Sequence, residues 1–290
     1  MVKVLKTAVL LGLLFLVGNM QYAFAQNSDS VSIPKSDTTK RVFSATVTIT
    51  EIMDSAFQMH YDTLIVENDN PVNYNKHKFQ TNWLIFDLGF ANFNDKTPYG
   101  SAAANEYLQG GAGGNFTKSD MRLRTVKSSN VNIWLFMQKY SLYKNKLNLK
   151  YGLGLEMFNF RYQNDITYHK NPDYIYRDTT SFQKNKLYTS YASIPFMLNY
   201  DPTPGTKWGF SASAGILVGY RIGAHTKQKS DEFGKVKQGG SFDLNDWRLA
   251  YTAEIGIGSI RIFGTYSIKP LQNNVMDQHP YAIGFRFSNW

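Results

Sequence analysis

The sequence predicts an all-β fold, an eight-stranded antiparallel transmembrane β-barrel, from three observations. Long segments alternate between apolar residues and small or polar residues. The connections between these segments alternate between long and short. Aromatic residues make up 15% of the chain, which suits a barrel with aromatic girdles at both membrane interfaces.

The segment 208–223, WGFSASAGILVGYRIG, shows the alternation most clearly. Its even-numbered positions are mostly apolar and include Trp208, Ile216 and Tyr220, whereas its odd-numbered positions are mostly small or polar and include Arg221. A period of two indicates an extended strand, and the run is longer than the about 5–6 residues usual in soluble proteins. A long strand of a soluble sandwich or a lipocalin-like barrel would look similar, so this segment alone leaves both open.

Residues 1–25 have the features of a secretory signal peptide. Lys3 and Lys6 precede a short apolar run, and Ala23 and Ala25 form a small-x-small cleavage site. The run falls short of the about 20 residues that a spanning helix needs, although an N-terminal anchor is the alternative. The chain has no cysteine, which excludes disulfides and cysteine-ligated metals.

Two segments separate the signal peptide from the barrel domain, which we expect over 82–290. Residues 26–40 are rich in Ser, Asp, Thr, Lys and Pro and predict a disordered leader. Residues 41–81 predict a periplasmic extension, with a β-hairpin over 41–69 followed by a linker.

Eight strands are expected in the barrel. They cover 82–93, 130–140, 147–158, 187–200, 208–223, 247–258, 260–268 and 281–287. The second strand has the least clear pattern, because both of its faces are apolar. Pro195 lies on the inward face of the fourth strand, and a local bulge is expected there because proline cannot donate to the ladder.

The lengths of the connections separate the two ends of the barrel. The connections 94–129, 159–185 and 224–246 are long, 143–146, 201–205 and 258–259 are short, and 269–279 is intermediate. Bacterial outer-membrane barrels have long extracellular loops and short periplasmic turns, whereas a soluble sandwich has no reason to sort its loops in this way. We therefore expect the outer membrane of a Gram-negative bacterium, with the N-terminal extension and the C-terminus in the periplasm.

Charged residues on the inward faces predict a structural ion-pair network. They are Asp87, Lys150, Glu156, Arg221, Arg248, Glu254 and Arg286. The lumen of an eight-stranded barrel is only wide enough for side chains, and unpaired buried charges are costly; a gated ion path is the alternative. Arg221 and Arg248 should lie at similar heights, with Glu156 and Glu254 as their expected partners.

Outward aromatic residues predict the girdle. The candidates are Trp208, Tyr220, Tyr251 and Tyr281.

Sequence motifs for catalysis are absent. The five histidines have no metal-ligand spacing, and there is no nucleophile elbow, phosphate loop or zinc motif. We therefore expect no catalytic, metal or cofactor-binding residues, no cofactor and no enzymatic activity. A hydrolase built from loop histidines is the alternative.

The formal net charge of +9 bears on the partners. A basic balance can indicate nucleic acid, but the signal peptide and the lack of a basic helix argue against it. The expected partners are outer-membrane lipid and lipopolysaccharide, the barrel assembly machinery during insertion, and a periplasmic or secretion-complex protein.

The order of motifs along the barrel resembles a known family. It runs NWLIFDLGF, KYGLGLE, ASIPFMLNY, SAGILVGYRIG with HTKQK, GTYSIKPL and HPYAIGFRF, and it resembles the PorT-like outer-membrane β-barrel proteins of the Bacteroidota. The resemblance implies an eight-stranded barrel and, through its eponymous member, a link to protein secretion. The chain departs from the usual barrel ending, because the outward register ends at Phe287 and Trp290 follows out of phase.

Together these features predict a structural or interaction role at the cell envelope. A membrane component of secretion or transport machinery is the alternative that the resemblance allows.

Overall fold

The computed structural model describes residues 78–206 and 208–288 of the chain. The expected signal peptide, leader and hairpin of the N-terminal extension lie outside the described residues. The first barrel strand begins at Phe79, slightly earlier than expected.

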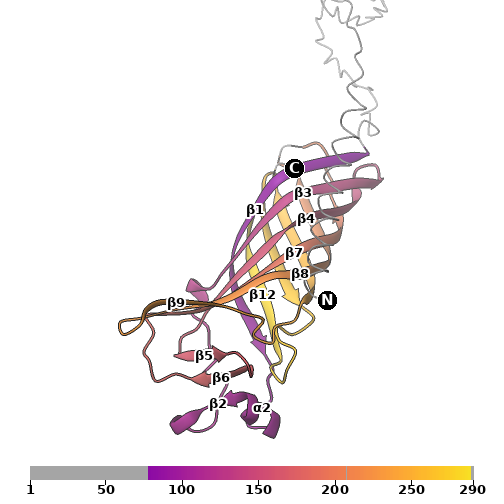
Figure 1. Ribbon diagram of the computed structural model, residues 1–290. Helices are drawn as coiled ribbons and strands as arrows, with labels where there is room; N and C mark the ends of the chain where they lie inside the picture. The colour runs from indigo at the N-terminus through magenta and orange to yellow at the C-terminus, as the bar shows by residue number, and fades with distance from the viewer. Residues whose placement is uncertain (1–77, 207, 289–290) are drawn as a thin grey trace, which may run out of the picture. The chain divides into compact units, whose positions relative to one another are not determined.

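Eight antiparallel strands form a closed barrel, which confirms the expected fold (Figure 1). Each strand pairs with the next strand of the barrel, the last pairs with the first, and β8 pairs with β10 across the third long connection. The strands are β1 (Phe79–Asp95), β3 (Ser129–Tyr143), β4 (Leu147–Arg161), β7 (Lys184–Tyr200), β8 (Phe210–Ser230), β10 (Trp247–Ile257), β11 (Ile260–Ser267) and β12 (Gln278–Phe287).

The two faces of the barrel wall differ as a membrane requires. In β1, the large apolar side chains of Phe86, Leu88 and Phe90 are 48–55% exposed, while Asp87 between them is fully buried. The same pattern continues around the barrel, so that large aliphatic and aromatic side chains cover the outside and polar groups fill the lumen. This is the arrangement of a transmembrane barrel. No helix in the described part of the chain is long and apolar enough to cross a membrane.

Two bulges interrupt the alternation within the barrel wall, and a third register shift lies at the end of β3, between Ser141 and Tyr143. Opposite β4, the register of β3 shifts between Trp134 and Phe136, so Leu135 is the extra residue and the inward face changes parity there. Opposite β7, β8 carries Ile222 as an extra residue. The bulge expected at Pro195 is wrong, because the registers of β7 with β4 and with β8 are unchanged on either side of that proline.

The long connections form a cap at one end of the barrel. The first contains α2 (Ala102–Tyr107), β2 (Leu108–Gln109) and the 3₁₀ turns η1 (Gly111–Gly113) and η2 (Thr125–Lys127). The second contains β5 (Ile166–His169) and β6 (Tyr174–Arg177), and the third contains β9 (Gly234–Gly239). Strands β2, β6 and β5 form a small sheet of their own, which the sequence pattern had not predicted.

The cap and the adjoining end of the barrel share one hydrophobic core. Phe158 and Phe160 of β4 stack on each other with ring centroids 5.6 Å apart. They pack in one cluster with Ile166 and Tyr168 of the cap, all 3% exposed or less. The cap is therefore a folded plug that extends into the barrel mouth.

Candidate functional site

The lumen holds a buried network of ion pairs, whose centre is Arg286 of β12. Its Nε and Nη2 donate to the two carboxylate oxygens of Asp87, each at 2.7 Å, and its Nη1 donates to Glu254. The guanidinium lies over the rings of Trp134 and Phe263, with its Cζ 5.3 and 5.6 Å from their centroids. Asp87 also accepts from the indole N–H of Trp134 at 2.7 Å. A planar guanidinium suits this site because it can bind a carboxylate with two N–H groups and stack on aromatic faces.

Glu254 joins the neighbouring cations to this centre. It forms an ion pair with Lys150 of β4, and its Oε1 lies 3.8 Å from Nε of Arg261 of β11. The hydroxyl of Ser213 donates to the same carboxylate oxygen at 3.0 Å. Side chains from opposite walls of the barrel therefore meet in the middle of the lumen, as the narrow bore of eight strands allows.

A second ion pair lies nearer the cap. Arg248 Nη1 donates to Glu156 Oε2 at 3.0 Å, and Ser193 donates to the same oxygen at 2.7 Å. Arg248 also lies over the ring of Phe158, 5.0 Å from its centroid. The Glu156 side chain is fully buried and that of Arg248 is 4% exposed.

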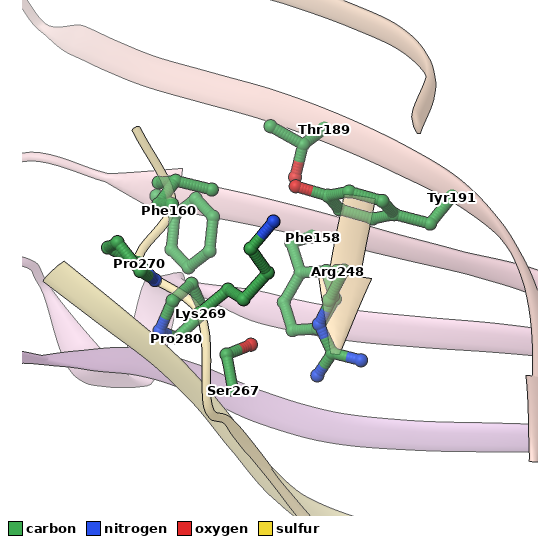
Figure 2. A pocket seen from close by; sticks show the side chains of 10 residues that line it. Phe158, Phe160, Thr189, Tyr191, Arg248, Ser267, Lys269, Pro270 and Pro280 are labelled. Carbon is green, nitrogen blue, oxygen red and sulfur yellow. The ribbon is translucent and has the colours of Figure 1, made fainter. Parts of the chain in front are cut away.

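A small cavity of about 10 Å³ adjoins Arg248 (Figure 2). Among the described residues, Arg248 Nε, Thr189 Oγ1 and Ser267 Oγ have no hydrogen-bond partner, and all three residues line this cavity. The volume is enough for about one water molecule, and a water there would have polar groups on three sides. The cavity is far too small for an organic ligand.

Among the residues expected in the lumenal ion-pair network, Arg221 is the one that the structure places outside it. Its Nη2 donates to Asp246 at 2.6 Å and to the carbonyl oxygen of Leu244 at 3.1 Å, at the rim where the third long connection rejoins the barrel. The expected pairing of Arg221 with Glu156 or Glu254 is therefore wrong. Arg221 lies at the end of the regular wall, directly before the Ile222 bulge.

Sequence reasoning missed two lumenal cations, Lys139 and Arg261. Both are at most 4% exposed. Arg261 stands between the outward residues Ile260 and Ile262, so the alternation could have revealed it. Lys139 follows the Leu135 bulge, which moves it to the inward parity and hides it from a simple period of two.

The aromatic girdle differs in part from the expectation. Trp208 is 73% exposed at the end with the short turns. Tyr220 is only 6% exposed because Trp247 packs on it with ring centroids 5.0 Å apart, so Trp247 is the exposed aromatic residue there. Tyr251 is 59% exposed, but it pairs with Ile216 in the middle of β8 and not at an edge of the apolar band. Tyr281, 37% exposed, lies in β12 near the cap.

Arg177 of β6 holds two parts of the cap together. Its Nε and Nη2 donate to the two oxygens of Asp120 at 2.8 Å each. Its Nη1 donates to the carbonyl oxygens of Gly113 and Gly114, at 2.7 and 3.1 Å, and its Nη2 donates to that of Asn115 at 2.9 Å. Burial opposes ionisation of Asp120, but hydrogen bonds from Arg177 and Thr117 outweigh it and lower the pKa of this carboxyl.

Hydrogen bonds also join the other connections. The side-chain amide of Asn245 in the third connection donates to the carbonyl oxygens of Pro270 and Gln272, each at 2.9 Å. These two residues lie in the fourth connection, which joins β11 to β12. The backbone N–H of Asp277 in the fourth connection donates to Thr97 Oγ1 in the first connection at 3.1 Å. Gln228 at the end of β8 donates to Thr167 Oγ1 in the second connection at 2.7 Å. The four connections therefore form one interlocked unit.

Two hollows on the outer surface of the cap are formed by residues that the structure describes. The larger, of about 460 Å³, lies between the first, second and fourth connections, and its lining includes Tyr107, Tyr174, Glu106 and Asp173. The other, of about 380 Å³, lies beside η2 and includes Lys118 and Arg122. Burial raises the pKa of Tyr107 above its ordinary value.

The described histidines do not converge on a catalytic arrangement. His169 stacks on Tyr174, and His225 stacks on Tyr188. His279 contacts Asp277 through Nε2 at 2.7 Å and the carbonyl oxygen of Ser267 through Nδ1 at 3.0 Å, so both ring nitrogens are engaged. In the described part of the chain, no group of three His, Cys, Asp or Glu residues is arranged to hold a metal ion.

Comparisons with known proteins add only distant likeness among solved structures. No protein-family model and no curated protein matches the chain. Among solved structures, the chain is similar to the crystal structure of Ail, the attachment invasion locus protein of Yersinia pestis, with 10% sequence identity and a TM-score of 0.29. The match covers 72% of this chain and 97% of that one. These values are too low for any function to be transferred.

Proposed function

We propose that this protein is an outer-membrane barrel with a closed lumen, whose cap binds another component of the cell envelope or its surroundings. The observation that carries this proposal is the filling of the interior. Paired charges occupy the lumen, and the hydrophobic core of the cap continues into the barrel mouth. The outer surface of the cap, with its two hollows, is then the place left for interaction.

The proposal requires that the cap faces the outside of the cell. The sorting of the connections supports this orientation, because outer-membrane barrels have long loops outside and short turns in the periplasm. Both ends of the described barrel, Phe79 and Phe287, lie with the short turns and would face the periplasm.

Labelling of single cysteines tests the orientation, because the chain contains no cysteine. Glu106→Cys places a thiol on the exposed surface of α2, and Lys144→Cys places one on the short turn between β3 and β4. A membrane-impermeant maleimide should label position 106 in intact cells, and position 144 only after the outer membrane is permeabilised. The reverse pattern, or equal labelling in intact cells, would contradict the proposal.

A role in secretion or transport machinery is the second candidate, and the PorT-like motif order is what favours it. The motifs that carry this resemblance fall almost wholly on β1, β4, β7, β8, β11 and β12, so they describe the barrel wall more than the cap. Affinity purification from detergent-solubilised envelopes tests this candidate. A stoichiometric complex that survives washing and includes periplasmic proteins would favour it, and recovery of the barrel alone would count against it.

A further inference from the structure

Six lysines form two rows across the three strands that extend beyond the barrel wall. Lys186 of β7 lies opposite Lys227 of β8, which lies opposite Lys237 of β9. Lys184 lies opposite Lys229, which lies opposite Lys235. We call these six residues the basic face.

Within the described residues, no carboxylate compensates the charge of the basic face. In the part of the chain that the structure describes, none of its lysines forms an ion pair with a carboxylate. Like charges directly opposite each other on a sheet are destabilising. Repulsion also acts between the two rows, because Lys235 of the other row, ahead of burial and the other neighbours, lowers the pKa of Lys227. Near the turn of the β8–β9 hairpin, Asp231 accepts a hydrogen bond from Gln183. An anionic partner would relieve the repulsion along both rows.

The opposite face of the same strands is already covered by the cap. Gln228 donates to Thr167 Oγ1 at 2.7 Å and to the carbonyl oxygen of Ile166 at 3.2 Å, and Asn185 donates to the latter at 2.6 Å. Figure 1 shows β9 projecting to one side of the barrel, with β5 and β6 on its side away from the barrel strands. The basic face is therefore the face of these strands away from the cap, and on β7 it has the same parity as the lipid-facing Ile194 and Phe196.

Two apolar residues bracket the basic face. Ile222, 46% exposed, ends the apolar band on β8, and Lys227 follows about 16 Å further along the extended strand. Phe233, 62% exposed, lies at the turn of the hairpin. Lysines close to a membrane surface, together with an exposed aromatic residue, are the combination that binds anionic headgroups.

We propose that the β8–β9 hairpin, residues 224–239, is an arm that binds the phosphate groups of the membrane leaflet next to the cap, with Phe233 entering the interface. In the orientation proposed above, this leaflet is the one that carries lipopolysaccharide, so the inference rests on the proposed function for the identity of the lipid. Lipid is favoured over a soluble polyanion because the basic face continues the outer wall of the barrel and ends in an exposed phenylalanine.

A spin label on Glu232→Cys, beside Phe233, reports directly on contact with lipid. The protein is reconstituted in phosphatidylcholine vesicles with or without lipid A, a phosphorylated glycolipid. Collisions of the label with oxygen, which partitions into lipid, are compared with collisions with a water-soluble nickel complex. Lipid A should raise the oxygen collisions and lower the nickel collisions at this position.

Two sets of charge variants make the test specific. In the arm variant, Lys227, Lys229, Lys235 and Lys237 are replaced by Gln, and the response to lipid A should be lost. The matched control replaces Lys96, Lys127, Lys144 and Lys146 by Gln, which removes the same charge from exposed sites outside the arm, and it should keep the response. Arginine at the four arm positions should keep it too. Heat-modifiable migration on gels verifies that every barrel is folded.

Three outcomes would overturn the proposal. The label could stay equally exposed to water in both kinds of vesicle, or the control variant could lose the response as fully as the arm variant. The third outcome is that inorganic phosphate in phosphatidylcholine vesicles reproduces the effect of lipid A, because a soluble anion would then suffice. Failure here is distinguishable from failure of the proposed orientation, because maleimide labelling at position 106 does not depend on the arm.

Discussion

At the scale of single residues, one arginine satisfies carboxylates from two strands. Arg286 binds Asp87 of β1 with two N–H groups and Glu254 of β10 with a third. Taking charges out of water is costly, and only well-placed partners offset that cost. Removing one partner should therefore harm the barrel far more than removing a similar charge from its surface.

Glu254→Gln tests the central carboxylate. The substitution keeps the size of the side chain but leaves Lys150, Arg261 and Arg286 with less compensation, and we expect it to lower the free energy of unfolding by about 3 kcal/mol. Urea unfolding in detergent micelles measures the change. Glu106→Gln on the exposed surface of α2 is the control and should unfold at the same urea concentration as the wild-type protein. If Glu254→Gln and Glu106→Gln unfold at the same urea concentration, the network does not stabilise the barrel.

The pair of Asp120 and Arg177 predicts a pH dependence of the cap. Because the pKa of Asp120 is lowered in the folded protein, its pair adds stability above the ordinary carboxyl pKa of about 3.9, and this stability is lost as the pH falls through the lowered pKa. Proteolysis within 110–120, by an acid-tolerant protease, should accelerate over that acidic range.

Asp120→Asn is the variant that isolates this effect. It should show the faster cleavage already at neutral pH and lose the acid-induced change. An acid response that persists unchanged in Asp120→Asn would assign it to other groups.

At the scale of the element, β8 carries a gradient of membrane depth. Ile216 is 44% exposed and lies opposite Phe196 of β7 and Tyr251 of β10. Ala212 lies nearer the short turns, and Ile222 lies at the bulge near the cap. Their shared outward face predicts how the membrane responds to a charge at each position.

Arginine substitutions at positions 212, 216 and 222 measure this gradient. Ile216→Arg should cost about 2–4 kcal/mol of folding free energy, because a lipid-facing charge is most costly at the bilayer midplane. Ala212→Arg and Ile222→Arg should cost less. Folding titrations in lipid vesicles give the three values. A flat series, or the largest cost at one end, would refute the outward assignment of β8.

The strands were predictable to the extent that lipid and lumen impose opposite chemistry on alternate residues. The strands other than β3 follow from that rule, whereas β3 is apolar on both faces, and the irregularities of the strands do not follow from the rule. The bulge at Leu135 lies between apolar residues on both faces, so no polar residue marks the change of parity that brings Lys139 into the lumen. The stretch of β8 beyond Ile222 is polar on both faces, and pairing with β7 and β9 holds it extended.

At the scale of the whole molecule, the interior leaves little room for transport. The pairs of Arg286 with Asp87 and of Arg248 with Glu156 lie at most 4% exposed within the bore. The cap could not be foreseen from the sequence, since its structure depends on contacts between residues far apart in the chain, such as Arg177 with Gly113 and Asp120. Polar, glycine-rich loop sequences carry no periodicity that would reveal such contacts.

Planar-bilayer recordings test the closure of the lumen. The purified protein should show no stable conductance, because ion pairs and the core of the cap fill the path. Removal of residues 102–120 would take away part of the cap but leave the lumenal network, and it should also fail to conduct. A large, reproducible conductance of the wild-type protein would contradict the closed lumen.

The pair of Asp87 and Arg286 also bears on how the chain assembles. These two residues face each other directly where the first strand meets the last, so this contact can form only when the cylinder is completed. A slip of one position along that seam would turn Arg286 towards the hydrocarbon. The ion pair therefore favours one register between the first and last strands when the barrel closes.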